Sequence, residues 1–147
     1  FIKEVKIGPM KKAAKKDRVL CLLLAADVHP TRQRLALASL LFDGMKKHIT
    51  AEEIYAAARK KRIAVSLATV YNTLHEFKAA GLLREIVVGK SHSYFDNNIK
   101  AHYHIYDEAT GKVRDIPSRS VRLIGLPKSI KGRPVGSIDI MIRLCKK

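Results

Sequence analysis

Residues 66–74 read Ser66-Leu67-Ala68-Thr69-Val70-Tyr71-Asn72-Thr73-Leu74. Leu67, Val70 and Leu74 recur at helical spacing, and Phe77 continues this apolar stripe. Because Ser66 is a typical N-cap and Gly81 a typical C-terminal residue, we predict a helix over residues 67–80. The other face of this helix carries hydrogen-bonding groups, with Tyr71 at its border: Ser66, Thr69, Asn72, Thr73 and Glu76. So dense a polar face indicates a helix that contacts a polar partner.

The composition suggests that this partner is a polyanion. The chain has 147 residues, with 29 Lys+Arg against 13 Asp+Glu and a formal net charge of +16. A charge of this size describes partners rather than fold, and a generic basic protein such as a ribosomal component shares it. A hydrophobic content of 47% is enough for a packed core. The length suits one domain, or two small domains that share a core.

The cysteines indicate a reducing compartment. Cys21 and Cys145 lie far apart and lack the CxxC spacing of a thiolate zinc site. A disulfide framework is not expected either, so we predict a cytoplasmic protein. Residues 19–26 are apolar but too few to span a membrane, and we predict a buried helix there and no membrane contact.

Capping residues divide the N-terminal part of the chain. Residues 1–16, with six lysines and one glutamate, are predicted to form a loose basic tail. Asp17 and Thr31 are candidate N-caps of the first two helices. Thr50 and Glu53 have the spacing of a capping box, which opens a third. The helices predicted before the one quoted above therefore cover residues 17–26, 32–43 and 51–61.

The sequence period changes to two after Gly81. Residues 83–88 and 93–96 predict two strands joined by a turn over residues 89–91. Helices followed by a small hairpin predict a winged helix-turn-helix over residues 17–96. In such a domain the last helix enters the major groove of DNA and the hairpin touches the backbone.

A second, smaller domain is predicted over residues 101–147, after a hinge at 97–100. Short strands are expected around 103–107 and 112–116, and a longer one over 138–144 follows a Pro/Gly-rich stretch. The predicted fold class is α+β, an N-terminal winged helix-turn-helix followed by a small α/β dimerisation domain. We predict a homodimer because so small a sheet has weak independent stability.

Seven residues are candidate DNA contacts. The amide of Asn72 can make two hydrogen bonds to an adenine edge, and Thr69 or Tyr71 can contact a thymine methyl group. Arginines on the preceding helix and a lysine in the hairpin are candidates for phosphate contacts. The alternative is that Tyr71 packs in the core and the hydroxyls are only solvated. The full predicted set is Arg32, Arg34, Ser66, Thr69, Tyr71, Asn72 and Lys90.

Histidines form a second pattern. His102 and His104 are two residues apart, which places both on one face of a strand. Asp96 ends the preceding strand, and His48 comes just before the third helix. Two or three histidines with a carboxylate suit Zn²⁺, Fe²⁺ or Mn²⁺, while two exposed histidines without a ligand are the alternative. The remaining histidines show no such pattern and are expected at the surface: His29, His75 and His92.

Four segments resemble the ferric uptake regulator family: Pro30–Arg34, His48–Tyr55, Ser66–Leu74 and Ala80–Arg84. The resemblance covers about residues 17–145 and is greatest to the iron response regulator branch, which Asp115-Ile116-Pro117 and Gly125-Leu126-Pro127 also resemble. The chain lacks the two CxxC pairs that many members use for structural zinc. It also lacks the Cys-Pro motif of that branch, and Ala101-His102-Tyr103-His104 replaces a segment richer in histidine.

The resemblance implies a dimeric bacterial regulator of iron- or haem-responsive genes. Its affinity for a double-stranded DNA operator would depend on Fe²⁺, Mn²⁺, Zn²⁺ or haem bound between its domains. The family's metal ligands correspond to His48, Asp96, His102 and His104 in this chain. Candidate haem ligands are His102, Tyr103 and His104.

Two other functions fit parts of the sequence. A metal-dependent hydrolase needs an open coordination position and a nearby general base, and no obvious base accompanies the histidines. We therefore expect no enzyme. A non-specific basic nucleic-acid-binding protein fits the charge but leaves the polar helix face unexplained.

Overall fold

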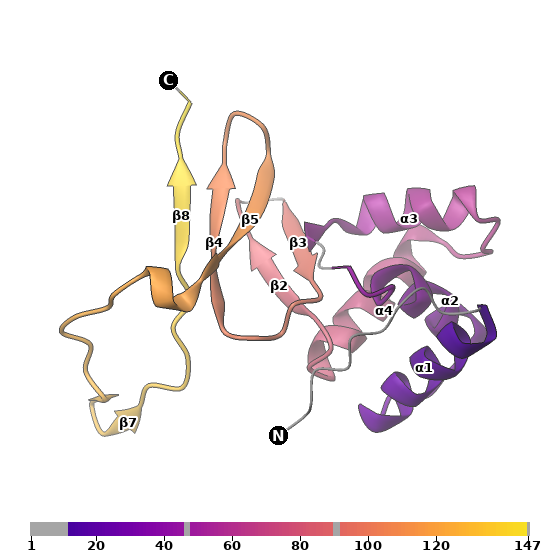
Figure 1. Ribbon diagram of the computed structural model, residues 1–147, viewed down its shortest axis with the longest axis horizontal. Helices are drawn as coiled ribbons and strands as arrows, with labels where there is room; N and C mark the ends of the chain where they lie inside the picture. The colour runs from indigo at the N-terminus through magenta and orange to yellow at the C-terminus, as the bar shows by residue number, and fades with distance from the viewer. Residues whose placement is uncertain (1–11, 46–47, 90–91, 147) are drawn as a thin grey trace. The chain divides into compact units, whose positions relative to one another are not determined.

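The computed structural model describes residues 12–45, 48–89 and 92–146, and the chain forms two compact units, residues 1–99 and 100–147. The described α-helices all lie in the first unit (Figure 1): α1 (Lys12–Ala25), α2 (Arg32–Leu41), α3 (Ala51–Lys60) and α4 (Leu67–Ala79). An antiparallel sheet of order β1-β3-β2 completes this unit, with strands β1 (His48–Ile49), β2 (Arg84–Val87) and β3 (Ser93–Asp96). No helix in the described part of the chain is long and apolar enough to cross a membrane.

Helix α4 is held by the burial of one of its faces. Val70, Leu74 and Phe77 are fully buried in the core that the four helices share. Thr73 is also buried, at 4% exposure, so its prediction on the polar face is wrong. The reason is helical geometry, because Thr73 lies three residues after Val70 and four before Phe77 and so shares their face.

Local hydrogen bonds set the ends of the helices. The Ser66 hydroxyl accepts the backbone N–H of Thr69 at 3.1 Å, which confirms the predicted start of α4. Gly81 ends α4 at φ +74°, a left-handed conformation that glycine adopts without strain. Thr50 and Glu53 form the predicted capping box of α3. Thr31 caps α2 as predicted.

The first helix differs from its prediction. It begins at Lys12, so Asp17 lies inside α1 and is not its N-cap. Alanine and lysine at positions 12–16 are strong helix formers, which extends the helix into the predicted tail. The rest of that tail, residues 1–11, and Lys90 of the hairpin lie outside the described residues.

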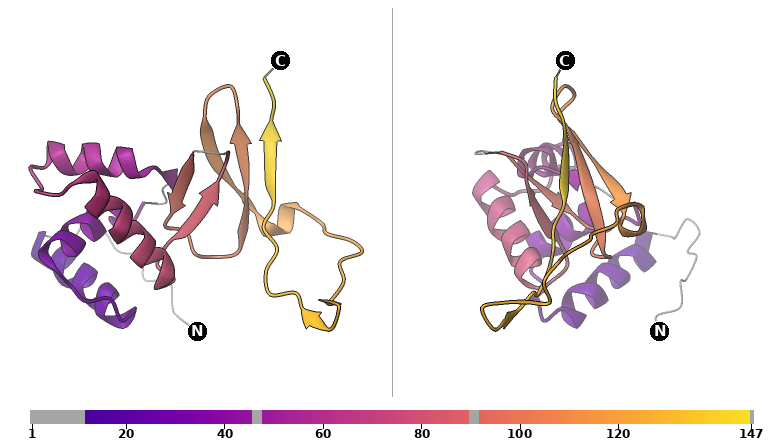
Figure 2. Two further views of the ribbon diagram at one scale, coloured as in Figure 1. Left: turned by 180° about the vertical axis from the view of Figure 1, so that it is seen from behind. Right: turned by 90° about the vertical axis from the view of Figure 1, so that its left-hand side faces the viewer.

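The second unit is built on a sheet of order β5-β4-β8, formed by β4 (His102–Asp107), β5 (Lys112–Pro117) and β8 (Met141–Leu144). Strand β4 is antiparallel to β5 and parallel to β8. Between β5 and β8 the chain leaves this sheet through a 3₁₀ turn, η1 (Ser118–Ser120), as Figure 2 shows. It then forms a two-stranded ribbon, β6 (Ser129–Ile130) and β7 (Arg133–Pro134). The α+β fold class is confirmed, although the last strand is shorter than residues 138–144.

Replacing a buried residue of α4 should destabilise the protein far more than replacing an exposed one. We expect Leu74→Ala to lower the free energy of unfolding by about 2–5 kcal/mol, because it leaves a cavity in the core. Asn72→Ala, on the exposed face of the same helix, should change it by less than about 0.5 kcal/mol. Urea unfolding followed by circular dichroism measures both, and equal losses would contradict this assignment of the buried face.

Candidate functional site

Two of the predicted DNA contacts have side chains available to a ligand. Asn72 is exposed on α4, and Arg32 is exposed at the start of α2. Neither side chain makes a hydrogen bond or an ion pair with any residue that the structure describes. Because Asn72 is two residues from the fully buried Val70 and Leu74, on the opposite side of the helix, the packing of α4 fixes the amide on the solvent side.

The other described DNA-contact candidates already bind groups of the protein. The Tyr71 hydroxyl donates to Glu52 Oε1 at 2.6 Å, from α4 to α3. Arg34 Nη2 lies 2.6 Å from Glu76 Oε2. The hydroxyls of Ser66 and Thr69 lie 2.9 Å apart and share a hydrogen bond at the start of α4.

The contact between Tyr71 and Glu52 shifts the pKa of both groups. The hydrogen bond from Tyr71 is the main cause that lowers the pKa of the Glu52 carboxyl. The same bond is the main cause that raises the pKa of the Tyr71 hydroxyl. At neutral pH Glu52 is therefore an ionised acceptor and Tyr71 a neutral donor. Residue Tyr71 stays 36% exposed although its hydroxyl is engaged, so part of its surface remains accessible to a ligand.

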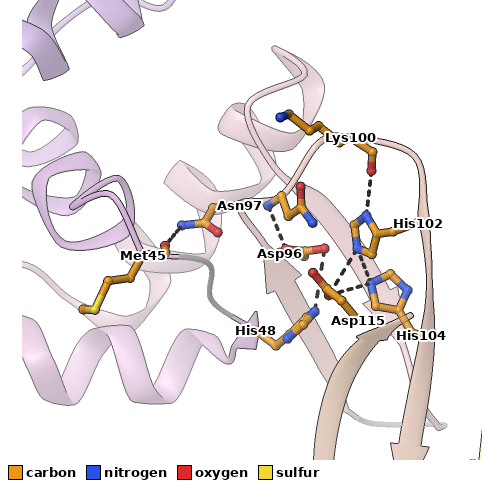
Figure 3. A network of polar contacts seen from close by, with 9 residues as sticks. Met45, His48, Asp96, Asn97, Lys100, His102, His104 and Asp115 are labelled. Carbon is orange, nitrogen blue, oxygen red and sulfur yellow. Dashed lines mark hydrogen bonds and ion pairs between the residues drawn. The ribbon is translucent and has the colours of Figure 1, made fainter. Parts of the chain in front are cut away.

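In the first unit, strand pairing brings two of the predicted metal ligands together. Antiparallel β1 and β3 pair in a register that sets His48 opposite Asp96. His48 Nε2 lies 3.7 Å from Asp96 Oδ2, and the Asp96 side chain is fully buried (Figure 3). The backbone N–H of Asn98 donates to Asp96 Oδ1 at 2.7 Å, which orients the carboxylate.

The next residue, Asn97, ties this strand to the end of α2. Its side-chain amide donates to the carbonyl oxygens of Leu41 at 2.7 Å and Met45 at 2.8 Å. These contacts join the chain that follows Asp96 to the segment that leads from α2 towards His48. The two ligands are thus held by strand pairing and by this side-chain link.

In the second unit, the other two predicted ligands lie beside a carboxylate. His102 and His104 occupy one face of β4, and their Nε2 atoms are 2.8 Å apart. Asp115 on β5 pairs with His104, and its Oδ1 lies 3.3 Å from His102 Nε2 and 3.9 Å from His104 Nε2. Figure 3 shows the three side chains converging from the two strands.

The hydrogen bonding of His102 suits a metal ligand. His102 Nδ1 lies 2.6 Å from the carbonyl oxygen of Lys100. Because a carbonyl oxygen only accepts, Nδ1 carries the proton, and in the neutral ring Nε2 keeps its lone pair. Metal-bound histidines commonly donate their other N–H to such an acceptor. Two imidazoles and one carboxylate on adjacent strands therefore fit a divalent ion.

Two features of this cluster differ from what the sequence suggested. Tyr103 lies on β4 between the histidines, and strand alternation places it on the opposite face, so the predicted haem ligands do not share a face. Asp115 was missing from the predicted ligands. The sequence did contain a signal for Asp115. If residues 107 and 112 are paired at the end of the predicted hairpin across Gly111, the antiparallel register also pairs residue 104 with residue 115, as the structure shows.

Comparison with known proteins assigns the chain to a family. Residues 25–130 match the ferric uptake regulator family. The chain belongs to the ferric uptake regulator family. It is 43% identical over 93 residues to the "Peroxide-responsive repressor PerR" of Staphylococcus epidermidis, and 42% identical over 93 residues to that of Staphylococcus aureus. The matched region covers 63% of this chain and about three fifths of each relative, 61% and 62%.

Solved structures of family members share the fold. A manganese-containing ferric uptake regulator from Pseudomonas aeruginosa superposes with a TM-score of 0.67 at 24% identity, covering 87% of this chain and 97% of that one. A peroxide stress regulator from Campylobacter jejuni gives a TM-score of 0.58 at 22% identity, covering 94% and 99%. At these identities the likeness concerns the fold alone.

Removing the Tyr71 hydroxyl should raise the pKa of Glu52 towards its ordinary value of 4.5, because the largest cause of its lowering is removed. Since the folded pKa is lowered, the hydrogen bond stabilises the protein above the unfolded pKa, and this stabilisation disappears as pH falls through the folded pKa. Carbon-13 NMR titration of wild type and Tyr71→Phe measures the shift. Tyr55→Phe, on α3, is the matched control, and an equal shift in both variants would contradict the hydrogen bond.

Proposed function

We propose that this chain is a sequence-specific DNA-binding transcriptional regulator of the bacterial cytoplasm, whose affinity for its operator depends on a divalent metal ion. The observation that carries the proposal is the exposed amide of Asn72, held outward by the packing of α4. An asparagine in this position of a recognition helix suits the edge of an adenine. The net charge of +16 supplies attraction to phosphates without sequence preference.

The predicted contacts then divide into roles. Asn72 reads base edges, and the partly exposed Tyr71 lies next to it in sequence for apolar contact with a thymine methyl. Arg32 is available for a phosphate. Arg34 must leave Glu76 before it can bind one, so we assign it a smaller part.

For the metal, we propose that one ion takes ligands from both units. His102, His104 and Asp115 form a set of two imidazoles and one carboxylate, which leaves coordination positions open. His48 and Asp96 supply further nitrogen and oxygen donors. An ion that binds both sets would favour one arrangement of the units over others, and so bias an equilibrium between a DNA-binding state and a weaker one.

Nitrogen and oxygen donors without a thiolate suit Fe²⁺ or Mn²⁺, and also Zn²⁺. The relatives named above are called peroxide-responsive repressors, which makes peroxide a second signal to test beside iron itself. Haem gains no support, since Tyr103 lies on the other face of β4 from the two histidines.

We also propose that the regulator acts as a homodimer. Ile138, Ile140, Ile142 and Leu144 alternate along the last strand, and Ile142 and Leu144 stay about two fifths exposed. Among the described strands β8 is an edge of its sheet, and an edge strand can pair with a strand of another copy. An exposed apolar edge of this kind suits a second copy of the chain better than water.

DNA reading is tested with the recognition helix. In Tyr71→Ala/Asn72→Ala, cognate binding should weaken by about 1–3 kcal/mol for each base interaction that the substitutions remove, while scrambled-duplex binding changes little. Fluorescence anisotropy at one salt concentration, on an operator obtained by in vitro selection, measures both. Lys112→Ala/Arg114→Ala in β5 is a control for general changes in binding. Equal losses on both duplexes would favour the non-specific binder.

Metal control is tested with the histidines. In His102→Ala/His104→Ala, operator affinity should no longer depend on Fe²⁺, Mn²⁺ or Zn²⁺, because the donor set is removed. Asp115→Asn should weaken metal binding because the amide carries no negative charge. His29→Ala/His92→Ala, which removes two exposed histidines, should keep the full metal response. Anisotropy titrations of apo and metal-loaded protein, with and without hydrogen peroxide or haem, measure these effects. An intact metal response in His102→Ala/His104→Ala would contradict the assignment of these residues as metal ligands.

A further inference from the structure

The Pro/Gly-rich stretch between β5 and β8 is basic and exposed. Residues 118–138 contain no aspartate or glutamate, and every residue from 122 to 139 is exposed. Helix α4 and the metal ligands use none of this segment. Its cations are Arg119, Arg122, Lys128, Lys131 and Arg133.

The middle of the segment has a defined shape. Strands β6 and β7 pair Ile130 with Arg133 around the two-residue turn Lys131-Gly132. Both turn residues have positive φ, +48° and +77°, as a tight hairpin turn of the primed type requires. The backbone N–H of Val135 donates to the carbonyl oxygen of Lys128 at 3.0 Å and continues the ribbon. Lys128, Lys131 and Arg133 are therefore displayed on a narrow two-stranded ribbon.

The chemistry of this ribbon suits DNA better than a protein partner. Lysine is depleted in protein interfaces, and Lys128 and Lys131 have no ion pair with any described residue. A narrow minor groove in A·T-rich DNA has an enhanced negative potential that attracts lysine and arginine. Exposed apolar residues such as Ile130 and Pro134 are of the kind that minor-groove proteins press against base steps.

We propose that the ribbon of residues 128–135 is a second DNA-binding element, which binds the minor groove of A·T-rich DNA independently of base reading by α4. This inference rests on the proposed DNA-binding function. Lys131 and Arg133 flank the turn glycine and supply the cations at the tip. The ribbon adds a preference for groove width and for A·T pairs to the sequence read in the major groove.

The experiment compares the full-length wild type with Lys131→Ala/Arg133→Ala on three duplexes without an operator. The first duplex carries an A·T tract, the second has G·C pairs in place of that tract, and the third has inosine·cytosine pairs there. An inosine·cytosine pair presents the minor groove of an A·T pair and a major groove close to that of a G·C pair. We expect wild type to bind the A·T and inosine·cytosine duplexes with similar affinity, and the G·C duplex several-fold more weakly. In the variant, the ratio of affinity for the A·T duplex to affinity for the G·C duplex should fall to about one. The slope of log affinity against log salt should fall by about 2, because two cations no longer neutralise phosphates.

Lys112→Ala/Arg114→Ala is the matched control, because it removes one lysine and one arginine with the same spacing from exposed positions of β5. It should keep the preference for the A·T minor groove. Equal losses of the ribbon variant on all three duplexes would overturn minor-groove binding. So would dissociation of a dimer in sedimentation with unchanged DNA binding, which would make the ribbon an interface between copies.

The two proposals can fail separately. Tyr71→Ala/Asn72→Ala should lose the preference for the selected operator and keep the preference for A·T over G·C tracts. If wild type shows the tract preference but none for the selected operator, the ribbon stands and the proposed base reading by α4 fails. If wild type prefers the operator but not the A·T and inosine·cytosine tracts, the ribbon proposal fails and base reading stands.

Discussion

Burial of one face of α4 is the constraint on which the DNA-facing surface depends. Val70, Leu74 and Phe77 reach no solvent, so the helix cannot turn about its axis without exposing them. This fixes which polar residues point outward. Thr73 joins the core although it is polar, and its neighbour Asn72 is left as the amide that no described residue binds.

Strand geometry orders the metal ligands in a comparable way. Alternation along β4 places His102 and His104 on one face and Tyr103 on the other. Pairing with β5 then adds Asp115, and the Lys100 carbonyl sets the tautomer of His102. The Asp115 carboxylate, the tautomer of His102 and the shared face of the two histidines together suit a divalent metal ion better than haem.

The large positive charge is not spread evenly over the proposed DNA-binding surfaces. On the helical side, Glu52 and Glu76 engage Tyr71 and Arg34, so composition overstates the groups available for DNA there. In the second unit, residues 118–138 carry cations and no acidic residue. Net charge does not reveal this difference, because a side chain is available to DNA only if no carboxylate of the protein lies within hydrogen-bonding distance of it.

Sequence alone determined α2, α3 and α4, their caps at Thr31, Thr50 and Ser66, and the α+β class, but it placed the start of α1 too late. These signals act over a few residues, through helical period and side-chain-to-backbone hydrogen bonds. Residue spacing and the family resemblance together supplied four of the five metal-ligand candidates. Only the tertiary structure decided the pairing of His48 with Asp96 and the hydrogen bond of Tyr71 with Glu52. Those interactions join different elements, and strand register and helix packing, which no local pattern encodes, bring them together.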